Sequence, residues 1–151
     1  EKKDISFNLI VAEALRRVEG QIKENQVRVQ VGSGFPIVHV DAERLVEVVQ
    51  NLIENAIKFT GNQKQPDVEI NYYLKDGLPV FYVHDNGIGI RKEFQDRIFG
   101  LFDKLNPDSE GTGIGLALVK RIIEVHGGKI WVKSQEGAGA TFYFTLGSSK
   151  T

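Results

Sequence analysis

Two asparagines and a lysine recur at helical spacing in the middle of the chain. Asn51, Asn55 and Lys58 stand at positions i, i+4 and i+7, so on a helix they share one face. A carboxamide oxygen is a ligand for a hard cation, and an ammonium group neutralises phosphate. The pattern therefore suits a site for a metal-bound phosphate compound, although a solvated helix face would show the same residue types.

Two glycine-rich stretches follow this segment, at residues 85–90 and 111–116. The second reads G-x-G-x-G, which is neither a P-loop nor a complete dinucleotide-binding fingerprint. Glycines that open a helix let backbone N–H groups approach an anion, and the helix N-terminus favours negative charge. In the first stretch Asp85 places a carboxylate just before Gly87 and Gly89, an arrangement that a simple turn would also produce.

The elements that must position these residues follow from hydrophobic periodicity. Apolar residues at helical spacing predict a long helix that begins after the N-cap Asp41 and carries both asparagines. Further helices are predicted at 8–24, with Asn8 as a possible cap, at 91–99 and at 114–125. Alternating apolar residues predict strands at 27–31, 37–40, 68–74, 80–83, 129–134 and 140–146. This order indicates an α/β (α+β) two-layer sandwich with helices on one face of a mixed sheet.

The composition is that of one globular domain. The chain has 151 residues, of which 41% are hydrophobic and 26% charged. A net charge of −1 argues against a nucleic-acid partner, and no apolar run reaches the roughly 20 residues that span a bilayer. The absence of cysteine excludes disulfides, thiol catalysis and cysteine-ligated zinc. Because the chain begins at Glu1 without methionine, we expect residues 1–151 to be one domain of a longer protein.

Together these motifs resemble the ATP-binding catalytic domain of sensor histidine kinases, which belongs to the gyrase/histidine-kinase ATPase superfamily and has the Bergerat fold. The resemblance covers nearly the whole chain, including the closing strands with His-Gly-Gly-Lys-Ile-Trp and Gly-Ala-Thr-Phe. The matched segments are 51–60 with the N box, 85–90 with the first glycine box, 98–102 with the F box and 111–116 with the second glycine box.

The resemblance implies an ATP site with bound Mg²⁺. Asn55 is expected to hold the Mg²⁺ that bridges the triphosphate, with Asn51 nearby and acting through water. Lys58 is expected to contact phosphate, which makes Asn55 and Lys58 the catalytic candidates. The resemblance places Phe59 against the adenine ring and makes Asp85 the acceptor for its exocyclic amine, a charge-assisted contact.

The same resemblance assigns roles to the two glycine boxes. Gly87 and Gly89 are expected to let the backbone pass close to the base. The glycines of the second box are expected to hinge a loop over the phosphates, which Thr112 and the helix-opening amides contact. The remaining positions expected at the nucleotide are Ile90, Ile98, Lys104, Gly111, Gly113, Ile114, Gly115 and Leu116.

Two of these assignments have a second interpretation. Lys104 follows the F box, where the family often has a basic residue facing phosphate, but its partner could equally be solvent. Phe99 and Phe102 are expected to anchor the lid by packing, because aromatic residues at this spacing usually belong to a core.

The function implied is that of a protein-histidine kinase in two-component signalling. None of His39, His84 and His126 has the His-Glu/Asp context of the family's phosphoacceptor. We therefore expect the acceptor histidine on a separate dimerisation domain, so that this chain is monomeric and does not autophosphorylate while the parent is a homodimer. The other expected partner is the receiver domain of a response regulator. The domain is expected in the cytoplasm, with a parent that is either membrane-anchored or soluble.

Two other classes of function compete with this interpretation. Hydrolytic ATPases and serine kinases of the same superfamily usually carry a glutamate four residues before the metal-binding asparagine, whereas this chain has Asn51 there. An amide cannot accept a proton from water, which disfavours that class. The second rival is a non-catalytic nucleotide-binding module, which intact motifs disfavour.

Overall fold

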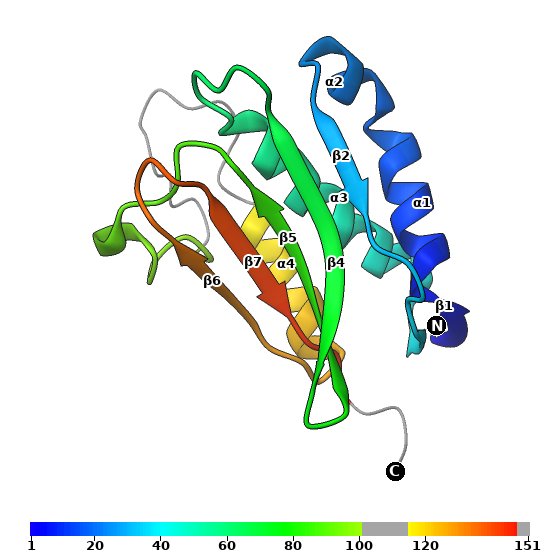
Figure 1. Ribbon diagram of the computed structural model, residues 1–151. Helices are drawn as coiled ribbons and strands as arrows, with labels where there is room; N and C mark the ends of the chain where they lie inside the picture. Colours follow the sequence, from blue (N-terminus) through cyan, green and yellow to red (C-terminus); the bar gives the residue numbers. More distant parts are fainter. Residues whose placement is uncertain (101–114, 148–151) are drawn as a thin grey trace.

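The computed structural model describes residues 1–100 and 115–147 (Figure 1). The helices are α1 (Phe7–Arg17), α2 (Glu19–Glu24), α3 (Ala42–Lys58) and α4 (Gly115–Val125), with a short 3₁₀ helix η1 (Lys92–Phe94). The strands are β1 (Lys3–Ser6), β2 (Arg28–Val31), β3 (Ile37–Val40), β4 (Asp67–Lys75), β5 (Leu78–Asp85), β6 (Ile130–Ser134) and β7 (Ala140–Phe144).

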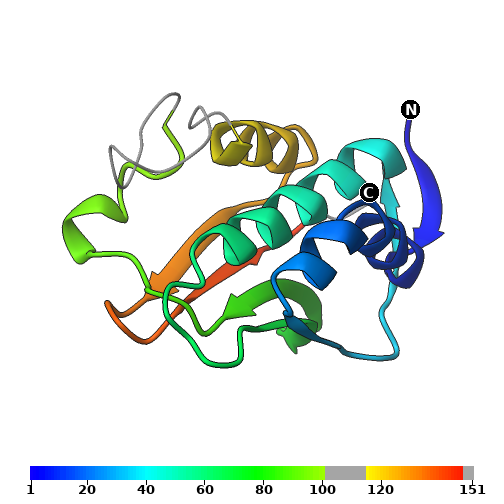
Figure 2. The same cartoon turned by 90° about the horizontal axis from the view of Figure 1, so that it is seen from above.

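Five strands form the main sheet in the order β2-β4-β5-β7-β6. The β2–β4 pair is parallel and the other pairs are antiparallel, so the sheet is mixed as predicted. Helices α1, α3 and α4 lie side by side on one face of this sheet (Figure 2). The expected two-layer fold is therefore confirmed.

Phenylalanines from the sheet and from α1 fill the space between the two layers. The rings of Phe7 and Phe81 stack with centroids 4.1 Å apart, and Phe81 stacks on Phe144 at 5.4 Å. These three side chains and Phe142 are each at most 2% exposed. The alternation predicted for β7 thus places Phe142 and Phe144 in the core, where burial of large rings contributes strongly to stability.

The long central helix begins where the sequence predicts. Asp41 adopts an extended conformation, and its Oδ1 accepts the Arg44 N–H at 3.3 Å. This bond satisfies one of the N–H groups that a helix start leaves without a partner. The core face of α3 consists of Leu45, Val46, Val48, Val49, Leu52, Ile53, Ala56 and Ile57.

Two helix predictions need correction. The predicted helix 8–24 is two helices, because Val18 leaves helical geometry at φ −110° and ψ 14° while its side chain stays fully buried. Its cap is Ser6, whose hydroxyl accepts the Asn8 N–H at 3.3 Å, so Asn8 lies in the first turn and is not the cap. The predicted helix 91–99 is only η1 followed by turns.

One strand was not predicted. Three of the four residues of β1 are polar and none is buried, so no hydrophobic alternation marks them as a strand. They pair antiparallel with β3 in a separate two-stranded sheet. The predicted strand 37–40 therefore exists but lies outside the main sheet. The bounds of the other predicted strands differ by one or two residues.

Candidate nucleotide-binding site

The face of α3 that turns away from the core carries the three residues predicted for metal and phosphate. Asn51 and Asn55 are half-buried and Lys58 is exposed, and we call these three residues the helix wall. The Nδ2 of Asn51 donates to the Glu47 carbonyl one turn earlier at 2.8 Å. Within the described residues no hydrogen bond holds the Asn55 amide, so its oxygen is available to a ligand.

The helix wall meets the start of α4. A Cβ atom placed on Gly115 would lie 3.0 Å from Oδ1 of Asn51. That distance is shorter than ordinary van der Waals contact, so glycine lets the first turn of α4 approach the asparagine closely. The N-terminus of a helix favours anions, and Gly115 therefore brings this favourable end beside the residues that are expected to handle phosphate.

The opposite side of the candidate site is the end of β5 and the turn after it. We call Asp85, Gly87 and Gly89 the strand wall. Asp85 is 4% exposed, and its Oδ1 accepts the Gly87 N–H at 2.8 Å. Burial raises the pKa of the Asp85 carboxyl above its ordinary value, while hydrogen bonds from the Gly87 and Ala140 backbones oppose that rise.

Both glycines of the strand wall are required by contacts within the protein. A Cβ on Gly87 would collide with the carbonyl oxygen of Phe59, and one on Gly89 with the carbonyl oxygen of Gln135. Gly89 also has φ +76°, a left-handed conformation that favours glycine. Their expected approach to the adenine base stays a prediction, because packing alone explains the glycines.

Phe59 joins the two walls. It is the C-cap of α3, and its carbonyl accepts the Ile88 N–H at 3.0 Å, within the first glycine box. The Nζ of Lys58 lies 5.9 Å from the centre of the Phe59 ring. The Phe59 backbone therefore connects the helix wall to the strand wall, and stacking of its half-buried ring on a base stays a prediction.

Two further predicted positions are part of the core. Ile90 is 5% exposed and Ile98 is 2% exposed, and both pack with the central hydrophobic cluster. From the core they can support the candidate site. Direct contact of Ile90 or Ile98 with a nucleotide stays a prediction. Of the second glycine box, Gly115 and Leu116 are half-buried at the start of α4. Phe102, Lys104, Gly111, Thr112, Gly113 and Ile114 lie outside the described residues.

Two residues that brace the first glycine box were not predicted. The Ser134 hydroxyl accepts the Ile90 N–H at 2.7 Å and donates to the Gly139 carbonyl at 2.8 Å. The Gln95 amide donates to the Ile90 carbonyl at 2.9 Å. Neither residue type nor spacing marks them in the sequence, because their partners are backbone groups of distant segments.

The three histidines have structural partners. Nδ1 of His126 lies 2.9 Å from the Ile122 carbonyl, and Nε2 accepts the Asp41 N–H at 3.1 Å, which joins α4 to α3. His39 contacts Asp4 at 2.8 Å and His84 contacts Thr141 at 2.6 Å. Each of the three side chains thus has a polar partner within the protein.

The donor set suits Mg²⁺ held jointly with a nucleotide. Within the described residues no group of three or more His, Asp or Glu side chains could hold a metal alone. Mg²⁺ commonly takes one or two protein oxygens and completes its shell with substrate phosphates and water. The Asn55 carboxamide oxygen fits that use.

Comparison with known proteins identifies the family of this chain. Residues 40–150 match the family described as histidine kinase-, DNA gyrase B- and HSP90-like ATPases. The chain therefore belongs to this ATPase family. Within the family it is similar to histidine kinases and to their catalytic domains, so it is an ATPase domain of the histidine-kinase type, and the resemblance stated from the motifs is confirmed.

Three relatives define the similarity. The methanogenesis regulatory histidine kinase FilI of Methanothrix harundinacea is 45% identical over 141 residues, which are 93% of this chain and 16% of FilI. The solved catalytic domain of the histidine kinase ThkA is 28% identical, with a TM-score of 0.81 over 97% of this chain and 95% of that one. Full-length ShkA in complex with AMPPNP is 26% identical, with a TM-score of 0.81 over 99% of this chain and 32% of ShkA. The chain thus spans about a sixth of the length of FilI, a relative much longer than this domain.

In the described part of the chain, no helix has the length and apolar character needed to cross a bilayer.

Proposed function

We propose that this chain binds Mg-ATP and transfers the γ-phosphate to a histidine on a separate dimerisation and phosphoacceptor domain. The observation that carries the proposal is the buried carboxylate of Asp85, joined through Phe59 to a helix face with Asn55 and Lys58. The AMPPNP complex of the related ShkA supports an ATP-type ligand.

Each wall would contribute a different part of the chemistry. Asp85 accepts a hydrogen bond from the exocyclic amine of adenine, and Phe59 packs on the ring. Asn55 holds Mg²⁺ and Lys58 contacts phosphate. Bound Mg²⁺ neutralises charge on the phosphate oxygens, which is the main electrostatic requirement of phosphoryl transfer. The residues of this chain position the nucleotide and leave the γ-phosphate for an acceptor from outside.

The neutral side chain of Asn51 favours transfer over hydrolysis. Its Nδ2 donates to the Glu47 carbonyl, and its Oδ1 faces Gly115 at the start of α4. An amide oxygen can hold water but cannot remove its proton, and general-base catalysis contributes roughly 10²–10⁴-fold. A hydrolytic ATPase or serine kinase is therefore the weaker candidate, and a non-catalytic module is the other.

The decisive experiment follows the label of γ-³²P-ATP. The isolated domain should bind Mg-ATP, remain monomeric and acquire no acid-labile label. Addition of the parent's phosphoacceptor domain in trans should produce acid-labile label on that added domain, and a receiver domain should then remove it. Label on this chain itself would contradict the proposal. Binding of ATP without labelling of the added domain would favour the non-catalytic module.

A further inference from the structure

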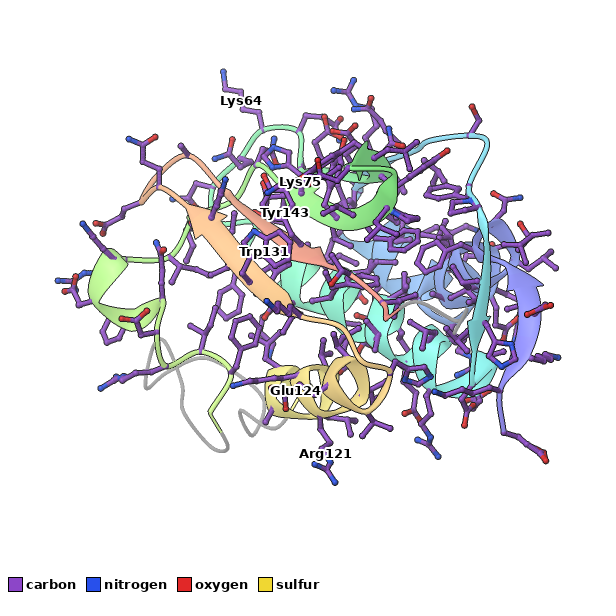
Figure 3. The ribbon with its side chains drawn as sticks, turned by 90° about the horizontal axis from the view of Figure 1, so that it is seen from below. Lys64, Lys75, Arg121, Glu124, Trp131 and Tyr143 are labelled. Atoms are coloured by element: carbon purple, nitrogen blue, oxygen red, sulfur yellow. The ribbon has the colours of Figure 1, made fainter. Side chains whose placement is uncertain are left out.

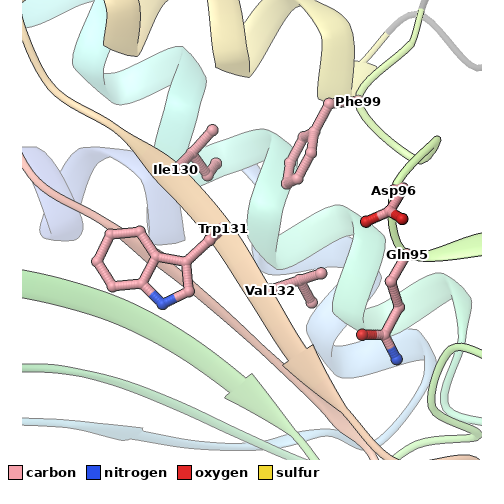
Figure 4. Close-up of a pocket in the computed structure, with 6 residues that line it drawn as sticks. All are labelled: Gln95, Asp96, Phe99, Ile130, Trp131 and Val132. Atoms are coloured by element: carbon pink, nitrogen blue, oxygen red, sulfur yellow. The ribbon is translucent and has the colours of Figure 1, made fainter. Parts of the chain in front are cut away.

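Strand β6 is an edge strand of the main sheet. A hollow lies beside it, and this hollow is not part of the candidate nucleotide site. Gln95, Asp96, Phe99, Ile130, Trp131 and Val132 line this hollow, which has a volume of about 270 Å³. Figure 4 shows Ile130 and Val132 pointing toward the segment that carries Phe99, whereas Trp131 points to the other side of the strand. The strand thus presents a different surface on each of its sides.

The backbone of β6 alternates between its partner strand and the free edge. Lys129 exchanges hydrogen bonds with Thr145 next to β7, and the Gln135 N–H donates to the Gly139 carbonyl. Because backbone groups alternate in direction along an antiparallel strand, Ile130 and Val132 direct their N–H and C=O groups away from β7. Within residues 1–100 and 115–147, the group that reaches this edge is the Gln95 amide, which donates to the Ser134 carbonyl at 3.3 Å.

The open face of the sheet continues this edge with aromatic side chains. The Trp131 and Tyr143 rings stack 5.5 Å apart with planes at 8°, and Tyr82 lies 6.0 Å from Tyr143. Figure 3 shows Trp131 and Tyr143 side by side on this face. Nζ of Lys133 lies 5.7 Å from the centre of the Tyr143 ring, so its charge is also on this face.

Charge selects what can pair with the edge. Residues 129–133 read Lys-Ile-Trp-Val-Lys, with both lysines exposed on the open face. A second copy of β6, paired in register in either direction, would place lysine opposite lysine, and like charges directly opposite are unfavourable. Carboxylates at the same positions would pair with both ammonium groups.

We propose that the β6 edge binds an extended strand from a partner protein, in which two acidic residues flank an apolar-x-apolar core. Its backbone pairs with the free groups of Ile130 and Val132, as in strand addition to other sheet edges. The two apolar side chains enter the hollow beside Phe99, and the central residue lies against Trp131. The acidic residues face Lys129 and Lys133.

The test uses a synthetic peptide with the core Glu-Val-Thr-Val-Glu, which has the same pattern in both directions, and its counterpart Lys-Val-Thr-Val-Lys. Trp131 is the one tryptophan of the chain, so its fluorescence reports on the edge directly. We expect saturable binding of the acidic peptide, with affinity at least about tenfold higher than that of the lysine peptide. Equal binding of the two peptides, or none, would overturn the proposal.

Charge reversal at the two lysines provides a more specific test of the proposed pairing. The double variant Lys129→Glu/Lys133→Glu should prefer the lysine peptide, whereas the matched control Lys64→Glu/Lys75→Glu changes the same charge at exposed positions elsewhere and should keep the original preference. An unchanged preference in the first variant would overturn the proposal.

Val132→Pro should weaken binding of the acidic peptide by about tenfold, because it removes the edge donor and leaves the bonds to β7. A cooperative thermal unfolding transition close to that of the wild type shows that each variant is folded, and unchanged peptide binding by a folded Val132→Pro variant would contradict the proposed pairing. A fluorescence change on raising protein concentration without peptide would identify a second copy as the partner and would also overturn the proposal.

Discussion

The strand wall and the helix wall differ in how the rest of the protein holds them. Asp85 is buried, its carboxylate accepts backbone N–H groups, and the glycines beside it are packed against carbonyls of Phe59 and Gln135. Asn55 and Lys58 lie on a half-open helix face, and the Asn55 amide has no hydrogen-bond partner in the described residues.

This difference suits two kinds of recognition. A base is distinguished by a few hydrogen bonds of fixed geometry, which a buried and preorganised acceptor provides. A metal with its phosphates keeps several water ligands, so it needs oxygen atoms at an accessible surface. The contrast predicts that variants in the strand wall change which nucleotide binds, whereas variants in the helix wall change what happens at the phosphates.

The largest expected effect is at the first residue of the helix wall. Asn51→Glu places a carboxylate one helical turn before Asn55, the proposed metal ligand, where it can accept a proton from water. We expect phosphate release under saturating Mg-ATP to rise about 100-fold, within the range that a general base contributes. The matched control is Asn51→Gln, which has the same length without a base and should leave release unchanged.

The wild-type domain sets the reference for that measurement. Its phosphate release should be far slower than about 1 s⁻¹, the low end of typical enzyme turnover. Steady release at or above that rate would show that another base is present, and the assignment of Asn51 would then be wrong.

The next largest effect concerns the strand wall. Asp85→Ala removes the proposed acceptor for the adenine amine, so ATP affinity should fall about 10–100-fold, as expected for loss of a charge-assisted hydrogen bond. The wild type should bind ATP at least about tenfold more tightly than GTP, because guanine presents a carbonyl to the carboxylate. Titration calorimetry measures the affinities for ATP and GTP. Glu69→Ala, on the other face of the sheet, is the control for the lost charge. Equal affinity for ATP and GTP would contradict this role of Asp85.

A smaller effect separates the two asparagines. Asn55→Ala should lower ATP affinity in Mg²⁺ about tenfold and have little effect in EDTA, because only the metal contact is lost. Asn51→Ala should have a weaker effect in Mg²⁺, since a residue acting through water contributes less. Titrations with and without Mg²⁺ show which of the two alanine variants has the larger effect on ATP affinity. A larger effect of Asn51→Ala would make Asn51 the principal metal ligand.

The smallest effect is a pH dependence with opposite signs for stability and binding. Burial raises the pKa of Asp85, so the folded protein favours the protonated form. The resulting stabilisation is fully present below the ordinary carboxyl pKa and is lost as pH rises through the raised pKa. A donor such as the adenine amine favours the ionised form, so ATP affinity should instead rise with pH over that window, by at most about tenfold per unit.

The variant Asp85→Asn isolates this contribution from those of other carboxylates. Differences between wild type and variant, in thermal unfolding without nucleotide and in ATP titration, should change with pH only inside this window and stay constant outside it. We expect the wild type to release protons when it binds ATP. Proton uptake would contradict the expected rise of ATP affinity with pH.

The sequence alone predicted the elements with strong periodicity and the residues that share them. Asp41, the apolar stripe of α3 and the alternation in β4, β5 and β7 are local patterns, so they specified the central helix, the hairpin and the mixed sheet. The same local spacing placed Asn51, Asn55 and Lys58 on one face, because i, i+4 and i+7 coincide on any helix. The glycine boxes stand out for a similar reason, since few residue types can replace glycine at close backbone contacts.

Other features depended on contacts between segments far apart in the chain. The break at Val18, the Ser6 cap and the pairing of polar β1 with β3 arise where packing overrides weak local preference. The link from Phe59 to Ile88, the brace of Ser134 and the burial of Asp85 join distant backbone groups whose partners no local pattern reveals. Tertiary structure therefore decided that the two walls meet and that one is buried, because burial and the pKa that follows from it belong to the surroundings of a residue and not to its type.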